Sequence, residues 1–487
     1  MLVNSGSLVG TTVITSALGF AYWWLAARQF PPEAVGIASA SVSTMLLLGS
    51  FCMLGLGTLL ITELPRQPGR EVSLISTALV VVGVAGAGIG VLFAVVAPYA
   101  SVEFNPLKAS ATNIVVFAAG VSLTAITLVL DQALIGILCG SLQLWRNTIF
   151  AVAKVILLFV IGLYLSQKAG MTIYTTWVGG VALSLATLLG FVIYRKGWLG
   201  RAYFPQWGLL RKLGLAALQH HLLNLTLEAP TLILPVLVTV LLSAKMNAWF
   251  YISWMIASFI FDVPIALTTV LHAMNSAQQS SLRHKARLTI GLALVTSVLA
   301  NCLLQFTTKQ VLGLFGSAYA EQATWCLRIL GLAAFPLIIK NHYISICRIQ
   351  DRVGRAMLGM LPGGALEVVT AMGGAYLGGL LGLSLGWVIA IVVEAILMFP
   401  TVYQTIRPMN SSLQAARQEN PQKNYIETEP TESMQRNGSN NCPARPQLRS
   451  ARLEQHTTHP ESLHTINTQL SLVCRLENAT EDSVSME

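Results

Sequence analysis

Two long stretches of the chain contain no charged residue, and they restrict the fold more than any other feature. Residues 34–62 and residues 72–102 lack Asp, Glu, Lys and Arg. A helix of about 20 apolar residues crosses the roughly 30 Å hydrocarbon core of a bilayer, so both stretches are long enough to span a membrane. The alternation of apolar and polar residues that marks the strands of a membrane barrel does not occur. Helices are therefore the expected spanning element.

The composition extends this conclusion to the whole chain. Hydrophobic residues make up 54% and charged residues 10% of the 487 residues, whereas about a quarter of the residues in a soluble domain are charged. The sequence predicts an all-α polytopic membrane protein with about twelve transmembrane helices. The expected spans are residues 7–27, 36–62, 73–99, 112–139, 147–167, 172–194, 213–242, 247–275, 287–308, 322–347, 354–376 and 381–404.

A basic segment divides these spans into two groups of six. Residues 195–212 contain five Lys and Arg residues. We expect residues 1–194 to form an N-terminal lobe, residues 195–212 a basic cytoplasmic linker, and residues 213–405 a C-terminal lobe. Because six is even, the second lobe enters the bilayer in the same sense as the first. The two lobes should therefore be related by a pseudo-two-fold axis along the membrane normal.

The basic residues also predict the orientation in the membrane. Lys and Arg concentrate in the connections after the even-numbered spans, as in Arg66, Arg70, Arg283 and Lys285, and such loops remain in the cytoplasm. Both termini of a multi-pass protein of the cytoplasmic (inner) membrane should thus be cytoplasmic. The positive charges lie in short loops, which is not the pattern of a nucleic-acid-binding face. Residues 406–487 are polar and poor in aromatic residues, which favours a disordered cytoplasmic tail.

Ionisable residues at bilayer depth are costly and are candidates for function. Glu228 and Asp262 lie about halfway along two consecutive spans, and His220 and His221 lie closer to the cytoplasm on the first of them. Two acids at one depth are able to share a proton or hold a coupling cation, and histidine titrates near neutral pH. We interpret these four residues as ion-coupling groups. The alternative is that each acid only helps to pack the helices.

Several cations and one amide are candidates for binding an anionic cargo. Arg28 ends the first span, Arg328 and Lys340 lie in the tenth, and Asn224 precedes Glu228 by one turn. Guanidinium and ammonium groups that face a hydrated cavity would bind phosphate oxygens. The alternative for Arg28 is an end charge that reaches the membrane interface.

Other charged residues favour a structural role. Asp131 and Lys154 lie in the cytoplasmic third of the fourth and fifth spans, so we expect an ion pair between them. Glu367 and Glu394 lie near mid-depth in the last two spans without an obvious partner.

The sequence also restricts the chemistry. It contains no GxxxxGK[ST] phosphate loop and no His/Cys cluster at the spacing of a metal site. The short outer loops leave no room for the acceptor site of a glycosyltransferase or polymerase. We therefore expect neither an enzyme nor a bound cofactor or metal, and H+ or Na+ is the expected coupling ion.

Loose motifs along the membrane part resemble one known family. They are Asn-Ser-Gly at 4–6, Leu-Ala-Ala-Arg at 25–28, Ala-Val-Gly at 34–36, Gly-Leu-Gly-Thr at 55–58, Asp-Gln-Ala-Leu-Ile-Gly at 131–136, Gln-Leu-Trp-Arg-Asn at 143–147 and Tyr-Ile-Ser-Trp-Met-Ile at 251–256. With these motifs the chain resembles the polysaccharide-biosynthesis branch of the multidrug/oligosaccharidyl-lipid/polysaccharide (MOP) flippase superfamily, which contains the O-antigen flippases.

The resemblance implies two six-helix lobes around a hydrated cavity that opens alternately to each side of the membrane. It implies a flippase for a polyprenyl-pyrophosphate-linked oligosaccharide, a precursor of polysaccharide or lipopolysaccharide. The expected partners are this lipid-linked oligosaccharide, membrane lipids and other membrane proteins of polysaccharide assembly.

Two other functions stay open. A multidrug exporter of the same superfamily would use Glu228 and Asp262 to bind organic cations. A non-transporting membrane scaffold would recruit partners through residues 407–487.

Overall fold

The protein is helical throughout the part that the structure describes. This computed structural model describes residues 2–164, 169–196, 208, 215–277, 282–350 and 352–407. Every regular element within those residues is an α-helix or a short 3-10 helix. Ten helices of this part are long and apolar enough to cross a membrane, and the longest has the length of two spans. The all-α polytopic fold predicted from hydropathy is confirmed.

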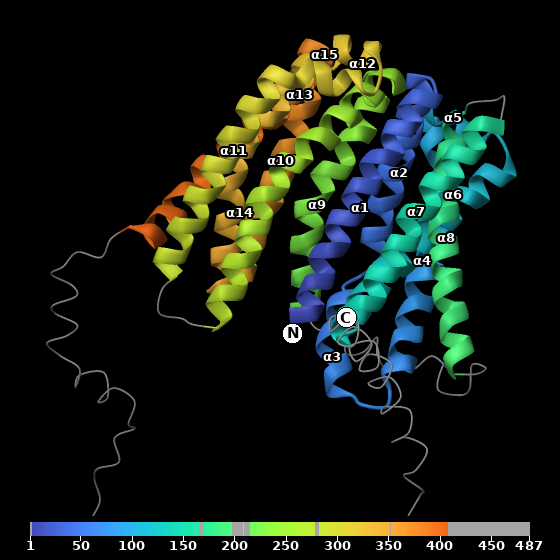
Figure 1. The fold of residues 1–487 in the computed structure, drawn as a ribbon, viewed down its shortest axis with the longest axis horizontal. Coiled ribbons are helices and arrows are strands. Elements are labelled where there is room, and N and C mark those ends of the chain that lie inside the picture. Colours follow the sequence, from blue (N-terminus) through green and yellow to red (C-terminus); the bar gives the residue numbers. More distant parts are fainter. Residues whose placement is uncertain are drawn as a thin grey trace, which may run out of the picture.

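The N-terminal lobe contains the first eight α-helices, which occupy the blue-to-green part of Figure 1. They are α1 (Leu2–Gln29), α2 (Pro32–Cys52), α3 (Leu56–Glu63), α4 (Glu71–Ala100), α5 (Asn105–Lys108), α6 (Ala111–Gly136), α7 (Gly140–Tyr164) and α8 (Gly170–Lys196), with 3-10 turns at Leu64–Arg66 and Val102–Phe104. Local signals fix their ends: α2 begins with Pro32, which suits the first turn of a helix. The Ser110 hydroxyl caps α6 by accepting a hydrogen bond from the Asn113 backbone amide.

The C-terminal lobe contains the remaining α-helices. They are α9 (Leu215–Leu241), α10 (Ala244–Ala277), α11 (Leu282–Gly313), α12 (Ser317–Gln322), α13 (Thr324–Leu332), α14 (Ala334–Ile349) and α15 (Val353–Ile406). Its packing repeats that of the first lobe, because α9 packs on α15 as α1 packs on α7. The two-lobe architecture agrees with the prediction of six spans on each side of a central linker.

Several predicted spans are interrupted in the structure. The span at residues 36–62 consists of α2 and α3, which are separated by Leu54 and Gly55 with φ of 49° and 79°. The last two spans form one element, α15, which turns back at Gly378 and Gly379. Its two halves approach so closely that a Cβ atom on Gly374 would lie 2.0 Å from the carbonyl oxygen of Gly382. Small residues permit such contact between membrane helices.

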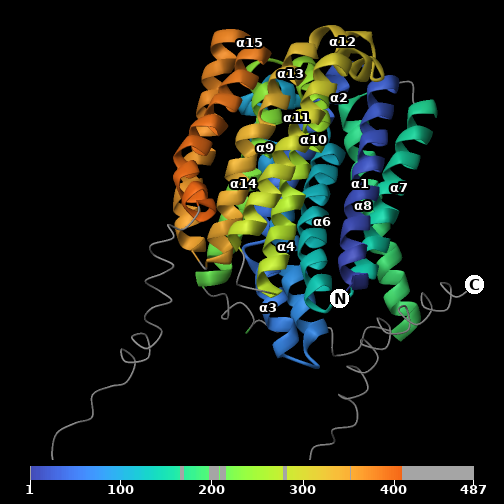
Figure 2. The same ribbon diagram turned by 60° about the vertical axis from the view of Figure 1, so that its left-hand side comes forward.

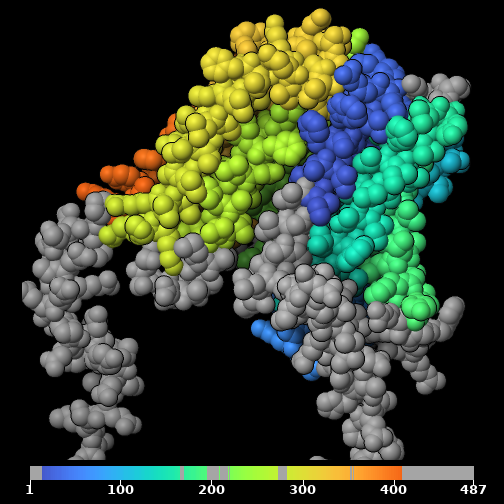
Figure 3. Space-filling model, in the orientation of Figure 1, coloured from blue at the N-terminus to red at the C-terminus, as the bar shows by residue number. Residues whose placement is uncertain are grey.

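The two lobes contact each other at one end of the molecule and diverge toward the other. Figures 1 and 3 show them meeting near α12 and separating toward the end that carries α3. Figure 2 shows the long helices of both lobes running between these two ends. We call them the α12 end and the α3 end. The connections predicted to be cytoplasmic, such as Leu64–Arg66, lie at the α3 end.

Two predicted segments cannot be compared with the structure. The basic linker, residues 195–212, lies outside the described residues except for the last turn of α8 and residue 208. The tail predicted at 406–487 lies outside them from residue 408 onward.

Candidate functional site

A polar cavity lies between the lobes toward the α3 end. One part has a volume of ≈ 400 Å³ and is lined by α2, α3 and α6 of the N-terminal lobe and by α9 and α14 of the C-terminal lobe. The other part has a volume of ≈ 520 Å³ and lies among α9, α10, α14 and α15. Asn224, Glu228 and Arg348 line both parts, so the two parts adjoin at these residues.

The shared wall carries groups that bind anions and hydroxyls. Arg348 Nη2 donates a hydrogen bond to Asn224 Oδ1 at 2.9 Å. Glu228 lies one turn further along α9 on the same face, and its side chain is exposed. His220 and His221 line the part of the cavity that both lobes share. A guanidinium, a carboxylate, an amide and two imidazoles therefore surround one space.

The structure places five of the predicted site residues along this cavity, with Lys340 lining the part inside the C-terminal lobe and the other four lining the part between the lobes. Asn224, Glu228, His220 and His221 line one cavity. Asp262 on α10 is exposed, but it is not among the residues that line either part. A proton path through both acids stays a prediction.

Arg348 was not among the predicted site residues, because it directly follows the tenth expected span at residues 322–347 and so falls in an expected cytoplasmic connection. In the structure α14 continues to Ile349, and Lys340, Ile344 and Arg348 all line the cavity. Their spacing of four residues places them on one helix face. That spacing is the signal by which the sequence could have identified Arg348.

Lys340 lines the cavity but is not a free cation. Its Nζ lies 2.5 Å from Glu367 Oε1 and 2.7 Å from Glu394 Oε2. Trp387 Nε1 donates a hydrogen bond of 2.7 Å to Glu367 Oε2. The two glutamates that had no partner in the sequence analysis thus hold the lysine, so Lys340 is compensated before any cargo arrives.

The α12 end of the lobe interface is sealed by backbone contact. Gly36 on α2 packs against Ala244 on α10 so closely that a Cβ atom on Gly36 would lie 1.7 Å from the Ala244 carbonyl oxygen. Asn247 Nδ2 donates hydrogen bonds to Gly36 O at 2.8 Å and to Ser39 Oγ at 3.0 Å. The Trp23 and Tyr251 rings, with centroids 4.6 Å apart, extend the contact between α1 and α10.

Arg28 belongs to this sealed end. Arg28 Nε and Trp24 Nε1 both donate hydrogen bonds to the Leu314 carbonyl oxygen, at 2.8 Å and 3.0 Å. Leu314 follows α11 in the C-terminal lobe, so the two donors connect the lobes. The structure does not place Arg28 as a cavity cation. Its guanidinium donates to a backbone carbonyl oxygen at the α12 end.

Arg328 also lies away from the cavity. Arg328 Nη2 donates a hydrogen bond to Gln305 O at 2.9 Å, and its guanidinium lies 5.2 Å from the centre of the Trp325 ring. Both contacts are within the C-terminal lobe. Arg328 therefore joins α13 to α11, and the cavity linings do not include it.

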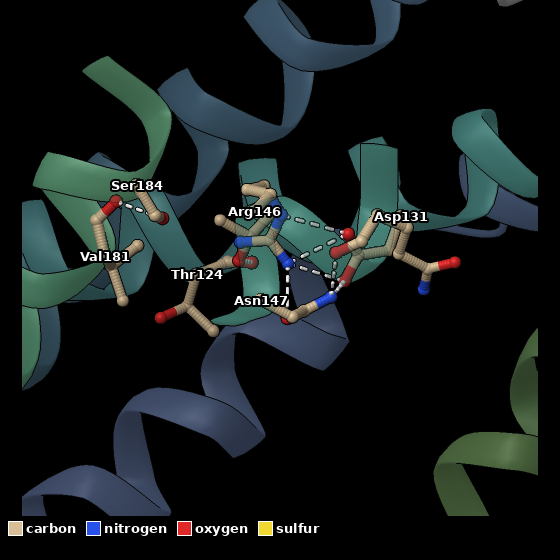
Figure 4. Close-up of polar contacts among 8 residues, drawn as sticks. Thr124, Asp131, Arg146, Asn147, Val181 and Ser184 are labelled. Carbon is tan, nitrogen blue, oxygen red and sulfur yellow. Dashed lines mark hydrogen bonds and ion pairs between the residues drawn. The ribbon is translucent and has the colours of Figure 1, made fainter. Parts of the chain in front are cut away.

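The predicted ion pair between Asp131 and Lys154 is wrong. Asp131 pairs with Arg146, whose Nη2 lies 2.8 Å and 2.7 Å from the two carboxylate oxygens, and Asn147 contacts both side chains. Figure 4 shows this cluster between α6 and α7. The Arg146 side chain is only 4% exposed and that of Asp131 20%, so the arginine of this pair is buried inside the N-terminal lobe and the acid is partly buried.

Lys154 occupies an aromatic cage instead. Its Nζ lies 3.8 Å from the centre of the Trp177 ring, 4.5 Å from that of Phe150 and 5.3 Å from that of Tyr22. The ring faces stabilise the ammonium electrostatically. The charge at residue 154 is thus compensated without a carboxylate.

The comparison with known families decides the assignment. The sequence profile of a family described as "Polysaccharide biosynthesis protein" matches residues 1–260. The chain belongs to this family. A sequence search finds no matching curated protein.

Solved structures similar to this chain include transporters of the MOP superfamily. An inward-facing multidrug resistance MATE family transporter has a TM-score of 0.66 at 14% identity and covers 85% of this chain and 99% of its own. The lipid II flippase MurJ in an inward-closed conformation has a TM-score of 0.62 at 11% identity, with coverages of 82% and 87%. A MOP superfamily transporter from Pyrococcus furiosus has a TM-score of 0.53 at 14% identity, with coverages of 82% and 94%.

These findings indicate a multi-pass membrane protein of the polysaccharide biosynthesis family, with ten described helices long and apolar enough to cross a membrane and a fold similar to that of MOP superfamily transporters. Within the part of the chain that the structure describes, no cluster of three or more His, Cys, Asp or Glu residues could hold a metal ion.

Proposed function

We propose that the protein is a flippase for a polyprenyl-pyrophosphate-linked oligosaccharide, a precursor of polysaccharide or lipopolysaccharide, in the cytoplasmic membrane. Both termini lie in the cytoplasm in this proposal, so the α3 end faces the cytoplasm. The structure then corresponds to the state that receives cargo from the inside.

The observation that carries the proposal is the polar cavity at the α3 end below a sealed α12 end. The sugar-pyrophosphate head of such a cargo does not cross hydrocarbon unaided, so the protein needs only a polar path and two alternating states. Asn224, His220 and His221 supply hydrogen-bonding groups along the path. The lipid tail stays in the bilayer while the head passes between the lobes.

Arg348 is the group that we assign to the pyrophosphate. It lies at the last turn of α14 and lines both parts of the cavity. Arginine binds phosphate oxygens in two parallel hydrogen bonds, and Arg348 is held by Asn224, not by a carboxylate. Lys340 is already paired with two glutamates, which makes Arg348 the better phosphate ligand of the two.

The membrane potential favours the outward direction of transport. Each charge that moves through the potential exchanges about 2.3 kcal/mol per 100 mV. An anionic head that leaves an inside-negative cytoplasm is therefore driven outward. The direction of transport in this proposal follows from the charge of the cargo.

A multidrug exporter is the second candidate. Glu228 is an exposed acid in the cavity, and acids in such a cavity attract organic cations. Arg348 in the same wall opposes cationic cargo, which is why we favour the flippase.

The test is the content of lipid-linked sugars in cells that lack the protein, measured by mass spectrometry of lipid extracts. One polyprenyl-linked oligosaccharide should accumulate, and restoring the gene should reverse the accumulation. An unchanged pool together with new sensitivity to cationic dyes would instead identify a drug exporter. A chain that ends at residue 407 should still restore the pool, whereas loss of function on this truncation would favour the scaffold.

A further inference from the structure

Three charged side chains meet inside the C-terminal lobe, and together they carry more negative than positive charge. Lys340 comes from α14, and Glu367 and Glu394 come from the two halves of α15. The lysine lies between the two carboxylates, 2.5 Å from one and 2.7 Å from the other. We call these three residues the Lys-Glu-Glu cluster.

The backbone is shaped to admit this cluster. A Cβ atom on Gly363 would lie 2.8 Å from the Glu394 carboxyl group, so any larger residue there would displace it. Glu367 and Glu394 are each 2% exposed. Such placement in the apolar interior is expensive for charged groups unless they are fully compensated.

The compensation is incomplete when both acids are ionised. One ammonium faces two carboxylates, which leaves a net charge of −1 on the Lys-Glu-Glu cluster. Trp387 supports Glu367 with a hydrogen bond of 2.7 Å. Glu394 has no such donor, and its Oε1 atom finds no hydrogen-bond partner among the described residues. Glu394 is thus the member whose charge is least supported.

A proton balances the cluster better than a metal ion does. The Lys340 ammonium already occupies the space between the carboxylates, where a metal would bind them. The described residues hold no cluster of three His, Cys, Asp or Glu that would ligate a metal. We propose that the Lys-Glu-Glu cluster is an exchangeable proton site, in which Glu394 alternates between carboxylate and carboxylic acid. The proposal rests on the transport function above and identifies its coupling ion as H+.

Uptake of one proton changes the cluster from a net charge of −1 to zero, with Lys340 still an ammonium and Glu367 still a carboxylate. Two other charged groups line the cavity that Lys340 and Glu367 line. From α9, Glu228 lines the same cavity, and from α14 so does Arg348. The α10 residues that line this part are uncharged, namely Trp254, Phe261, Ile265, Thr268 and Thr269.

In this proposal Glu228 relays protons between the Lys-Glu-Glu cluster and the part of the cavity that both lobes line. It lines both parts of the cavity, one of which Glu367 also lines and the other of which His220 and His221 line. A proton that enters among the histidines would reach Glu228 before Glu394. Three of the four predicted ion-coupling residues, His220, His221 and Glu228, thus line the route proposed toward Glu394, and Asp262 does not.

The test is infrared difference spectroscopy of the full chain in lipid nanodiscs, between about pH 5 and about pH 8. Wild-type protein should gain a carboxylic-acid C=O band at the lower pH, and Glu394→Gln should lose it. Lys340→Met removes the cation between the two carboxylates. The glutamate pair of this variant should therefore hold an additional proton, which enlarges the carboxylic-acid band at the higher pH. Glu33→Gln, which changes an exposed acid at the α12 end, should leave the band as in wild type.

Two results would overturn the proton site. One is a wild-type spectrum without a band, and the other is a band that Glu394→Gln leaves unchanged. The opposite responses expected of Glu394→Gln and Lys340→Met separate lost protonation from poor folding, because misfolding would alter both spectra alike. If lipid-linked sugar accumulates in cells without the protein while the band is absent, the flippase stands and only its coupling site fails. If the band behaves as expected while no lipid-linked sugar accumulates, the proton site stands and the cargo assignment fails.

Discussion

The two ends of the lobe interface differ in what holds the lobes. At the α12 end, backbone meets backbone, with Gly36 against Ala244 and Asn247 bonded to the Gly36 carbonyl. At the α3 end the lobes face a cavity, and polar side chains such as Arg348 and Glu228 line it. The contact at Gly36 has no room for any larger side chain, whereas the cavity has room for cargo molecules of different shape. In the function that we propose, the sealed end is the gate and the open end selects the cargo.

The largest effect is expected from Gly36→Val, which breaks the sealed end. The new Cβ atom would overlap the Ala244 carbonyl oxygen at 1.7 Å, and overpacking of this kind costs about 1–3 kcal/mol. The α12 end should open at rest, and transport should fall by at least about tenfold, which corresponds to about 1.4 kcal/mol. Labelling of a cysteine introduced at residue 244 from outside the cell would measure the opening.

A matched control for this prediction is Gly19→Ala on α1. No atom lies within 4 Å of the Cβ position there, so this variant should transport as wild type does. Equal loss in both variants would contradict a specific role for the Gly36 contact.

A smaller effect is expected from Arg348→Ala at the open end. The variant removes the cation assigned to the pyrophosphate and leaves Asn224 Oδ1 without its donor. A charge-assisted hydrogen bond contributes about 1.5–3 kcal/mol, so the apparent affinity for the lipid-linked cargo should fall by about tenfold or more. The control is Arg352→Ala, because Arg352 is exposed and does not line the cavity. Similar affinities of the two variants would remove Arg348 from the site.

Asn247→Ala should weaken the sealed end more mildly than Gly36→Val. It deletes two hydrogen bonds to α2, of 2.8 Å and 3.0 Å, each contributing about 1 kcal/mol. The external label should then react with an intermediate fraction of the protein. Asn113→Ala is the control, since its amide bonds only to Pro106 within the N-terminal lobe. A sealed end as tight as in wild type would show that the glycine contact alone suffices.

Arg28→Ala should have the smallest effect. Arg28 is exposed and bonds to a single carbonyl that Trp24 also serves. We expect a loss of about 0.5–1.5 kcal/mol in closure of the α12 end and no change in cargo affinity. External labelling measures closure of the α12 end, and titration with cargo measures its affinity. A large loss of cargo affinity would instead show that Arg28 contributes to cargo binding.

The spans were predictable because hydropathy is a local property of the sequence. Residues 34–62 identify a buried helix by composition alone, although the break at Leu54 and Gly55 depends on local backbone geometry. The partners of buried charges were not predictable in the same way. Asp131 pairs with Arg146 and not with Lys154, because the rotation of each helix about its axis determines which side chains meet.

The same reason explains the Lys-Glu-Glu cluster. Lys340 was assigned to a cavity and the two acids to no partner, because nothing in one span reports the direction of a side chain in another. Histidines and Glu228, in contrast, lie on one helix at turn spacing, so their common cavity followed from periodicity. Contacts within one helix are therefore readable from sequence, and contacts between helices are not.

The most direct test of alternating access is a pair of distances measured by electron spin resonance in lipid nanodiscs. Labels on unnatural amino acids at exposed residues 66 and 284 would report the α3 end, and labels at exposed residues 109 and 321 the α12 end. After addition of the lipid-linked oligosaccharide, the account predicts a shorter distance at the α3 end and a longer one at the α12 end. If both distances change in the same direction, or neither changes with a cargo that binds, the two ends do not alternate and the account is wrong.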